Sequence, residues 1–271
     1  MIRLTVCVPA EHAGRAVALG CALLERGCGE RVLADGSAAL DFWLPSAEAA
    51  AAATRLEREL EVDRLPARVE RTLEEPGWSA AARRFHQPFE VAGRLWVRPP
   101  WEPPRAGRAD VAIDPGMAFG TGQHATTRTC LELLAQLPAG SLLDVGCGTG
   151  ILAIAARRLG FEPVTAVDND PLAVEATVAN ARANGVGLSA GVRVAGRDPL
   201  PSAETLLANI AALALERLPT SLTPPFPRRA VVSGLRPAQV GVVADTLASV
   251  GLQAVREVDA EGWASVLLEA G

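Results

Sequence analysis

Residues 142–151 read Leu-Leu-Asp-Val-Gly-Cys-Gly-Thr-Gly-Ile, and this stretch decides the fold of the 271-residue chain. Leu142 to Val145 has the apolar composition of a buried strand, and a helical segment, Ile151 to Arg158, follows the glycines. The glycines let a ligand approach the backbone where side chains would collide. Doubly wound α/β sheets bind ligands at the carboxyl ends of their parallel strands. The stretch therefore predicts such a sheet, with a ligand at this loop.

The spacing of the glycines favours one class of ligand over another. Dinucleotide-binding enzymes use G-x-G-x-x-G, which admits a pyrophosphate onto the start of a helix. Here Gly146 and Gly148 begin a G-x-G-x-G loop, and Asp144 precedes it. An acid at this position would repel a pyrophosphate, but it suits the cationic amino group of a methionine moiety, reached through water. The pattern favours S-adenosylmethionine over NAD; the alternative is a tight strand-to-helix turn without a ligand.

The chain beyond Pro104 alternates between strand-like and helical segments. The segments that read as parallel strands are 142–145, 163–167, 191–195, 206–210 and 230–233. Two more, 253–258 and 264–269, read as an antiparallel pair at the sheet edge. Such alternation is typical of a parallel sheet with crossover helices. We therefore predict a doubly wound, seven-stranded, Rossmann-like α/β domain over residues 89–271.

The amino-terminal part follows a different pattern. Its segments are strand-like at 2–8, helical at 11–26, strand-like at 31–34 and 40–44, helical at 46–61 and strand-like at 68–73. This is the β-α-β-β-α-β order of a ferredoxin-like domain. We therefore predict a small α+β domain over residues 1–74 and a linker over residues 75–88. A hairpin around Ala92-Gly93 follows the linker.

Polar side chains end two further predicted strands. Asp168 lies about twenty residues after the glycine loop, where a carboxylate holds the ribose diol of a nucleotide. Asn209 ends the fourth strand. Its side-chain oxygen can accept a hydrogen bond from a substrate N–H and so orient the nitrogen lone pair toward a methyl group. We predict Asp168 as the ribose ligand and Asn209 as the catalytic residue, with a loop cap as the alternative for Asn209.

The residues beside these positions indicate the kind of amine and the local structure. Methyltransferases of planar nitrogens usually continue with Pro-Pro and an aromatic residue, whereas Ile210-Ala-Ala follows here. A flipped base would find no aromatic platform, so the pattern favours an aliphatic amine. Asp170-Pro171 is typical of a helix N-cap and the first helical residue. We interpret Asn180 and Asn184 as residues that close that helix.

Composition and charge exclude several classes of protein. The chain has 49% hydrophobic and 21% charged residues, as globular proteins do. A formal net charge of −5 disfavours direct nucleic-acid binding over a broad surface and fits a basic protein partner. His12, His86 and His124 are scattered and the five cysteines show no paired spacing, so we expect no metal. Without a long apolar stretch or a signal-peptide pattern, we expect no membrane contact and a cytoplasmic location.

A long and specific match precedes the glycine loop. Residues 113–134 read Ile-Asp-Pro-Gly-Met-Ala-Phe-Gly-Thr-Gly-Gln-His-Ala-Thr-Thr-Arg-Thr-Cys-Leu-Glu-Leu-Leu. This segment resembles the hallmark of the PrmA family, the methyltransferases of ribosomal protein L11. The resemblance extends to nearly the whole chain and is clearest again at 144–156, 167–171, 208–210 and 233–234. It departs at Gln123 and Ala125, where the family more often has threonine and proline.

The resemblance implies an S-adenosylmethionine-dependent protein methyltransferase. In this family the small amino-terminal domain captures the ribosomal protein, a linker repositions it, and the catalytic domain methylates its α-amine and lysine ε-amines. Residues 1–74 would then recognise the substrate, and residues 89–271 would form the methyltransferase domain. The family's cofactor contacts match Thr127, Gly146, Asp168 and Asn209. Together with Asp144 and Gly148 of the glycine loop, they make up the predicted cofactor site.

Several alternatives stay open at this point. His124 could cap the helix that contains Thr126 and Thr127, or it could touch the substrate. The whole protein could methylate another protein or a small molecule, act as an NAD-dependent oxidoreductase, or bind the cofactor or a ribosomal protein without turnover. The glycine spacing argues against the oxidoreductase, and the intact cofactor positions argue against a binding-only module. The identity and number of the methylated amines are not predicted.

Overall fold

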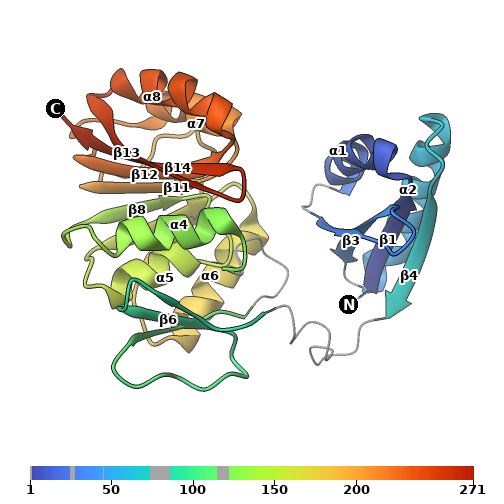
Figure 1. Ribbon diagram of the computed structural model, residues 1–271, viewed down its shortest axis with the longest axis horizontal. Coiled ribbons are helices and arrows are strands. Elements are labelled where there is room, and N and C mark those ends of the chain that lie inside the picture. Colours follow the sequence, from blue (N-terminus) through green and yellow to red (C-terminus); the bar gives the residue numbers. More distant parts are fainter. Residues whose placement is uncertain (1, 25–27, 45, 74–85, 115–121) are drawn as a thin grey trace. The chain divides into compact units, whose positions relative to one another are not determined.

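The computed structural model describes residues 2–24, 28–44, 46–73, 86–114 and 122–271. The chain forms two compact units, Met1–Ala82 and Arg83–Gly271 (Figure 1). Most of the predicted linker, residues 75–85, lies outside the described residues, and His86 to Pro88 belong to the second unit. In the part of the chain that is described, no helix is long and apolar enough to cross a membrane.

The first unit is the predicted ferredoxin-like domain. Its elements are β1 (Ile2–Val8), η1 (Ala10–His12), α1 (Ala13–Leu24), β2 (Gly29–Val32), β3 (Ala38–Leu44), α2 (Ser46–Val62) and β4 (Arg68–Leu73). The strands form an antiparallel sheet in the order β2-β3-β1-β4. The second strand was expected at 31–34 and is observed two residues earlier, and the third begins at residue 38 instead of the predicted 40. The β-α-β-β-α-β prediction is confirmed.

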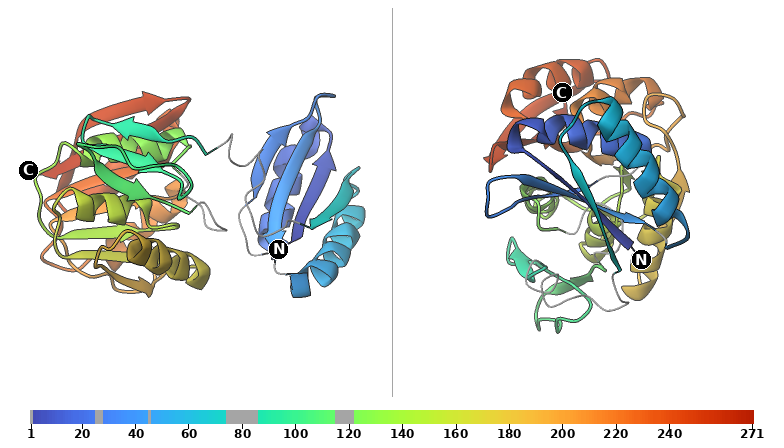
Figure 2. Two further views of the ribbon diagram at one scale, coloured as in Figure 1. Left: turned by 90° about the horizontal axis from the view of Figure 1, so that it is seen from below. Right: turned by 90° about the vertical axis from the view of Figure 1, so that its right-hand side faces the viewer.

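One face of this sheet is apolar because the side chains alternate along each strand. Leu4 and Val6 of β1 and Phe42 of β3 pack with Ala16 of α1 and Leu56 of α2 in a single core, whose elements Figure 2 shows from two directions. The opposite face carries the residues between them, including Thr5, which lies beside Asp41 across the β1–β3 pair. That face therefore holds the polar side chains of the sheet.

The second unit contains the predicted doubly wound sheet. Its strands are β8 (Leu142–Val145), β9 (Val164–Asp168), β10 (Ser189–Val192), β11 (Thr205–Asn209), β12 (Arg229–Leu235), β13 (Leu252–Ala260) and β14 (Trp263–Ala270). They lie in the order β10-β9-β8-β11-β12-β14-β13. The first five are parallel and β14 pairs antiparallel with both neighbours. The fold class and the antiparallel edge pair are confirmed, and β10 lies two residues before its predicted start.

Helices cover both faces of this sheet (Figure 1). One face packs on α4 (Ala125–Leu134), α5 (Ile151–Arg158) and α6 (Pro171–Ala183). The other packs on α7 (Ala212–Arg217) and α8 (Val240–Ala248), with the short turns η2 (Leu218–Ser221) and η3 (Pro237–Gln239) beside them. The strands read as nearly continuous apolar runs because both faces are buried. Their carboxyl ends, where the predicted site residues lie, meet at one edge.

A second, three-stranded sheet packs against the α5 side. It contains β5 (Phe89–Val91), β6 (Leu95–Arg98) and β7 (Ala109–Ala112), in that order. The hairpin between β5 and β6 turns at Ala92 and Gly93, as predicted, and Val91 pairs with Leu95 across the turn. The φ angles of Ala92 and Gly93 are +49° and +65°. The strand β7 was not predicted, because its four residues show no apolar alternation.

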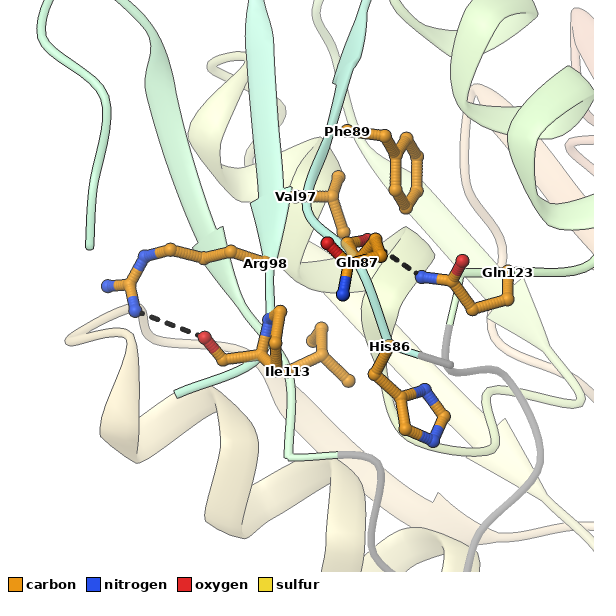
Figure 3. Close-up of a pocket in the computed structure, with 8 residues that line it drawn as sticks. His86, Gln87, Phe89, Val97, Arg98, Ile113 and Gln123 are labelled. Atoms are coloured by element: carbon orange, nitrogen blue, oxygen red, sulfur yellow. Dashed lines mark hydrogen bonds between the residues drawn. The ribbon is translucent and has the colours of Figure 1, made fainter. Parts of the chain in front are cut away.

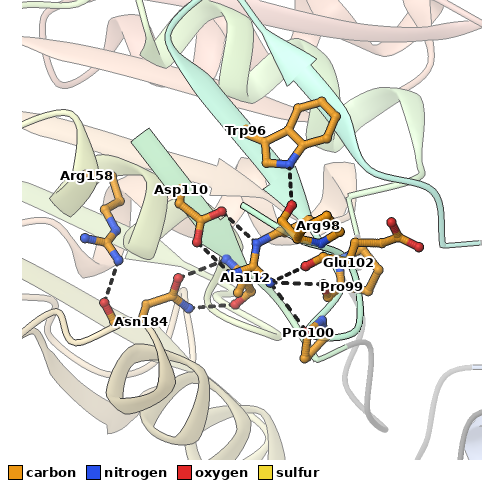
Figure 4. Close-up of polar contacts among 10 residues, drawn as sticks. Trp96, Arg98, Pro99, Pro100, Glu102, Asp110, Ala112, Arg158 and Asn184 are labelled. Carbon is orange, nitrogen blue, oxygen red and sulfur yellow. Dashed lines mark hydrogen bonds and ion pairs between the residues drawn. The ribbon is translucent and has the colours of Figure 1, made fainter. Parts of the chain in front are cut away.

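Asn184, at the end of α6, holds β7 in place (Figure 4), and Asn180 contacts two other segments. Asn184 is the C-cap of α6, as predicted. Its side chain also brackets Ala112, accepting from the backbone N–H (2.9 Å) and donating to the carbonyl oxygen (2.6 Å). Asn180 is buried inside α6, accepts from the backbone N–H of Asp114 (3.1 Å) and donates to the carbonyl of Thr149 (2.9 Å). Both asparagines therefore connect distant segments, but only Asn184 ends the helix; the predicted helix-closing role of Asn180 is wrong, because Asn180 lies within α6.

Candidate active site

The glycine loop lies between the ends of β8, β9 and β11. Gly146 has a φ of +77°, and a Cβ there would lie 2.2 Å from Cγ2 of Ile210, so only glycine fits without displacing a neighbour. The Gly146 N–H donates to the carbonyl of Val167 (2.8 Å), which fixes the loop against the end of β9. Gly148 also has a positive φ, +54°. The loop thus presents backbone, with little side-chain bulk, at this edge of the sheet.

Asp168 connects the glycine loop to the end of β9. Its Oδ2 accepts from the Gly148 N–H (2.9 Å) and its Oδ1 from the Asp170 N–H (3.0 Å). The side chain of Asp170 caps α6 by accepting from the Leu172 N–H (2.9 Å), so its predicted structural role is confirmed. Each Asp168 oxygen keeps a second lone pair. Two acceptor positions therefore lie beside the loop, where a diol could donate to them.

Asp144 is fully buried on β8 and only partly hydrogen-bonded. Its Oδ2 accepts from the Ala153 N–H in the first turn of α5 (3.1 Å). Its Oδ1 has no hydrogen-bond partner among the residues that the structure describes. Burial, and secondarily the charge of Asp168, raises the pKa of Asp144 to about 7, against the lowering effect of the Ala153 N–H. A buried acceptor without a partner is costly, which makes Asp144 the carboxylate with most to gain from a cation nearby.

Asn209 ends β11, opposite the glycine loop. Its Nδ2 donates to Oγ1 of Thr126 (3.2 Å) and, more weakly, to Oγ1 of Thr127 (3.5 Å), both in the first turn of α4. Thr127 is only 1% exposed. The structure thus brings two of the predicted site residues together across 82 positions of sequence. The amide nitrogen of Asn209 thus faces the two threonines, and neither hydrogen bond uses its side-chain oxygen.

His124 is the N-cap of α4. Its Nδ1 accepts from the Thr126 N–H (3.3 Å) and also lies 2.7 Å from Oγ1 of Thr126. Of the two roles left open by the sequence, helix capping is the one that the described contacts display. The imidazole packs edge-to-face against Trp263 at a centroid distance of 5.1 Å, and the Arg236 guanidinium lies 3.9 Å above the same indole. Sequence reasoning did not place Trp263 or Arg236 here, because no local pattern connects them to α4.

A small pocket lies between the three-stranded sheet and the segment before α4 (Figure 3). Gln123 crosses from that segment and donates through Nε2 to the Gln87 carbonyl (2.9 Å). A Cβ on Gly122 would lie 3.0 Å from the ring of Phe89, so the two segments are in close contact. Burial lowers the pKa of His86, another lining residue. Residues 115–121, which the resemblance includes in the family hallmark, lie outside the described residues.

Comparison with known proteins places this site in a family. The model of the family described as ribosomal protein L11 methyltransferase (PrmA) matches residues 15–270. The chain belongs to this family. A relative from Symbiobacterium thermophilum, named ribosomal protein L11 methyltransferase, is 40% identical over 210 residues, which are 74% of this chain and 68% of the relative. A relative of the same name from Alkalilimnicola ehrlichii is 44% identical, over 65% of this chain and 62% of the relative.

A solved structure agrees with the family assignment. The crystal structure of ribosomal protein L11 methylase from Lactobacillus delbrueckii subsp. bulgaricus matches with a TM-score of 0.59 and 25% identity, over 69% of this chain and all of that chain. The chain spans about two thirds of the length of the curated relatives it matches. Family membership confirms the predicted enzyme class, a methyltransferase, with S-adenosylmethionine as its methyl donor.

Proposed function

We propose that this protein transfers methyl groups from S-adenosylmethionine to the α-amine and lysine ε-amines of ribosomal protein L11. One observation carries the proposal: the family match runs from residue 15 to residue 270 and so includes the ferredoxin-like unit as well as the catalytic fold. A match to the catalytic fold alone would leave the substrate open, since one fold serves many substrates. With a ribosomal protein as its substrate, the enzyme would act in the cytoplasm.

The residues at the edge of the sheet fit the methyl donor. We assign Gly146 and Gly148 to the backbone surface against the cofactor, because both have a positive φ and the loop presents backbone at this edge of the sheet. Asp168 would hold the ribose diol with its remaining lone pairs. Asp144 would face the cationic amino group of the methionine moiety through its Oδ1, directly or through water. Thr127 and Asn209 would complete the site on the side where the methyl is transferred.

The reaction needs little from the protein beyond alignment and a neutral amine. The sulfonium of the donor supplies an activated methyl group. An alkyl ammonium with a pKa near 10.4 must lose its proton before it can attack, and an apolar site favours that loss because it disfavours the charged form. The Asn209 side-chain oxygen would then accept from the amine N–H and hold the lone pair in line with the methyl. Asn209 is in this sense catalytic, and the scheme requires no dedicated base.

The two units would divide the work. We assign residues 1–74 to recognition of the protein substrate, residues 75–88 to a linker and residues 89–271 to catalysis. The support is that Asp144, Asp168 and Asn209 all belong to the second unit. A separate compact module is an economical way to hold a protein substrate.

A labelling experiment tests the proposal. The pure protein is incubated with S-adenosylmethionine carrying a labelled methyl group and with ribosomal proteins from a cell that lacks this methyltransferase. We expect label on ribosomal protein L11, at its amino terminus and at lysines located by mass spectrometry. The Asn209→Ala protein serves as the matched control and should transfer little label. Label on another protein would replace the substrate, and label on no protein would favour a small-molecule substrate or a binding-only role.

A further inference from the structure

The orientation of the Asn209 amide decides whether the substrate amine faces a hydrogen-bond acceptor or a donor. The oxygen and nitrogen of an asparagine side chain have nearly the same shape, so surrounding hydrogen bonds determine which end points where. With Nδ2 toward the threonines, the end left for an amine is an acceptor. With the amide reversed, it would be a donor, which cannot accept the amine's N–H. The reaction proposed above therefore depends on whatever selects the first orientation.

The contacts of Thr126 select that orientation. The Thr126 backbone N–H can only donate, and it donates to Nδ1 of His124, so this ring nitrogen carries its lone pair. The Thr126 hydroxyl, 2.7 Å from the same nitrogen, must then donate its single hydrogen there. Its oxygen is left with lone pairs only. The Asn209 atom 3.2 Å away must therefore be a donor, because a side-chain oxygen at that position would oppose another acceptor.

The far side of His124 is held as well. The imidazole packs edge-to-face on Trp263, at the start of β14, and the Arg236 guanidinium covers that indole. Arg236 is itself tied by a hydrogen bond from Nη1 to the Gly262 carbonyl (3.0 Å). The ring is thus fixed between the first turn of α4 and the antiparallel edge of the sheet. A fixed ring keeps Nδ1 directed at the Thr126 hydroxyl.

We propose that Thr126, oriented by His124, is a positioning residue that sets the amide of Asn209 so that its oxygen faces the substrate amine. Asn209 donates to Thr126, and Thr126 donates to His124. No proton needs to move along this chain of hydrogen bonds. The inference rests on the proposed function, since it concerns the residue that would hold the amine. It assigns to Thr126 and His124 a role in alignment that is distinct from contact with the cofactor or the substrate.

Three variants of the full-length protein test the inference. Thr126→Val removes the hydroxyl with almost no change in shape, Thr126→Ser keeps the hydroxyl, and Thr246→Val removes a hydroxyl from α8, where it donates to the Val242 carbonyl. The measurements are kcat and KM for the protein substrate, the Kd of S-adenosylhomocysteine by calorimetry, and the melting temperature. We expect kcat of Thr126→Val to fall at least about tenfold while KM and Kd stay within about threefold, since misalignment lowers the rate of the chemical step.

The conservative variants separate positioning from a merely structural role. Thr126→Ser should recover kcat to within about threefold of the wild-type value, and Thr246→Val should match the wild type, because only the hydroxyl on α4 orients the amide. The inference is overturned if Thr126→Val keeps its kcat, if Thr126→Ser loses as much as Thr126→Val, or if the Kd weakens in parallel with kcat. The last result would mean that the hydroxyl serves the cofactor site.

A second measurement needs no substrate and keeps the two proposals separable. In protein carrying isotope-labelled asparagine, the Asn209 side-chain NH2 signals are those that disappear in Asn209→Asp. We expect them to exchange slowly with solvent in the wild type and Thr126→Ser, and faster in Thr126→Val. Unchanged signals in Thr126→Val would overturn the inference. Wild-type protein that methylates no ribosomal protein would instead overturn the proposed function, while the NH2 signals would still decide the orientation.

Discussion

Two buried carboxylates, one in each unit, differ in how fully their oxygens are hydrogen-bonded. Asp41 of the ferredoxin-like unit is 3% exposed, but it accepts from the Thr5 hydroxyl (2.6 Å) and from Nε of Arg31 (2.6 Å). Asp144 of the catalytic unit is 0% exposed, and one of its oxygens has no partner among the described residues. A buried charge is tolerated when it is paired, and is unfavourable otherwise.

The contrast separates a structural acid, Asp41, from Asp144, which we propose as a cofactor ligand. The partners of Asp41 belong to the same small sheet, so the folded chain itself completes that cluster. The hydrogen bond to Asp41 in turn raises the pKa of Arg31. Asp144 lies beside the glycine loop, where a cationic ligand would complete what the chain leaves unpaired. Local strain or unmet polarity of this kind is concentrated at functional sites.

Deletion of the first unit should have the largest effect on methylation. Removing residues 1–74 should abolish methylation of the folded protein substrate and leave the Kd of S-adenosylhomocysteine near that of the full chain, since the proposed cofactor residues all belong to the second unit. Calorimetry on the soluble truncated protein and an assay against the whole substrate measure the two quantities. Undiminished methylation by the truncated protein would contradict the recruitment role. Loss of cofactor binding together with activity would assign the first unit to stability instead.

Asp168→Ala should weaken cofactor binding by about 1.5–3 kcal/mol, because charge-assisted hydrogen bonds to a ribose would be lost. Calorimetric titration with S-adenosylhomocysteine gives this number directly. The matched control is Asp41→Ala, which removes a buried carboxylate from the other unit and should leave the Kd unchanged. An unaltered Kd for Asp168→Ala would place the ribose elsewhere.

Asp144→Asn should stabilise the cofactor-free protein by about 1–3 kcal/mol above pH 7, where the wild-type group is ionised although buried. The sign follows from a folded-state pKa of about 7 against an ordinary pKa of 3.8. Stability from the protonated wild-type group is fully present below pH 3.8 and is lost as the pH rises through about 7. The gain from asparagine should therefore shrink toward pH 4.

Denaturant titrations of the wild type and Asp144→Asn at several pH values check this window. A gain that is independent of pH would arise from packing and would contradict the charge argument. The same substitution should weaken binding of S-adenosylmethionine, because it removes the carboxylate charge that we propose faces the amino group. Stability and affinity should thus change in opposite directions at Asp144, which is not expected at Asp41.

The smallest expected effect belongs to Asp41→Asn. The substitution keeps the shape and one acceptor but removes the charge beside Arg31, whose side chain is 42% exposed and can be solvated instead. We expect a loss of about 1 kcal/mol in the free energy of unfolding of the first unit, after allowance for screening. Denaturant unfolding measures it, and methylation at saturating substrate should be unaffected. A loss as large as that of a fully buried ion pair would mean that Arg31 cannot be solvated.

Much of the fold could be predicted because its signals are local. Alternating side chains specified the strand Ile2–Val8, and the Asp170-Pro171 pair marked the start of α6. The glycine loop was recognisable since a positive φ at Gly146 restricts the residue that can stand there. These features depend on residues close together in the chain, so the sequence by itself determined them, together with the family and its methyl donor.

Only the tertiary structure decided which distant side chains meet. Asn209 and Thr126 are 83 residues apart, and Trp263 reaches His124 from the last strand of the sheet. Asn184 binds Ala112 of β7, 72 residues away in the chain. The sequence predicted Asn184 only as the end of a helix and so did not reveal this contact. Such contacts carry no local signal, because they depend on strand order and on how α4 and α6 pack. The same holds for Asp144: the sequence supplied the carboxylate, but only burial against α5 and the neighbouring Asp168 raises its pKa to about 7.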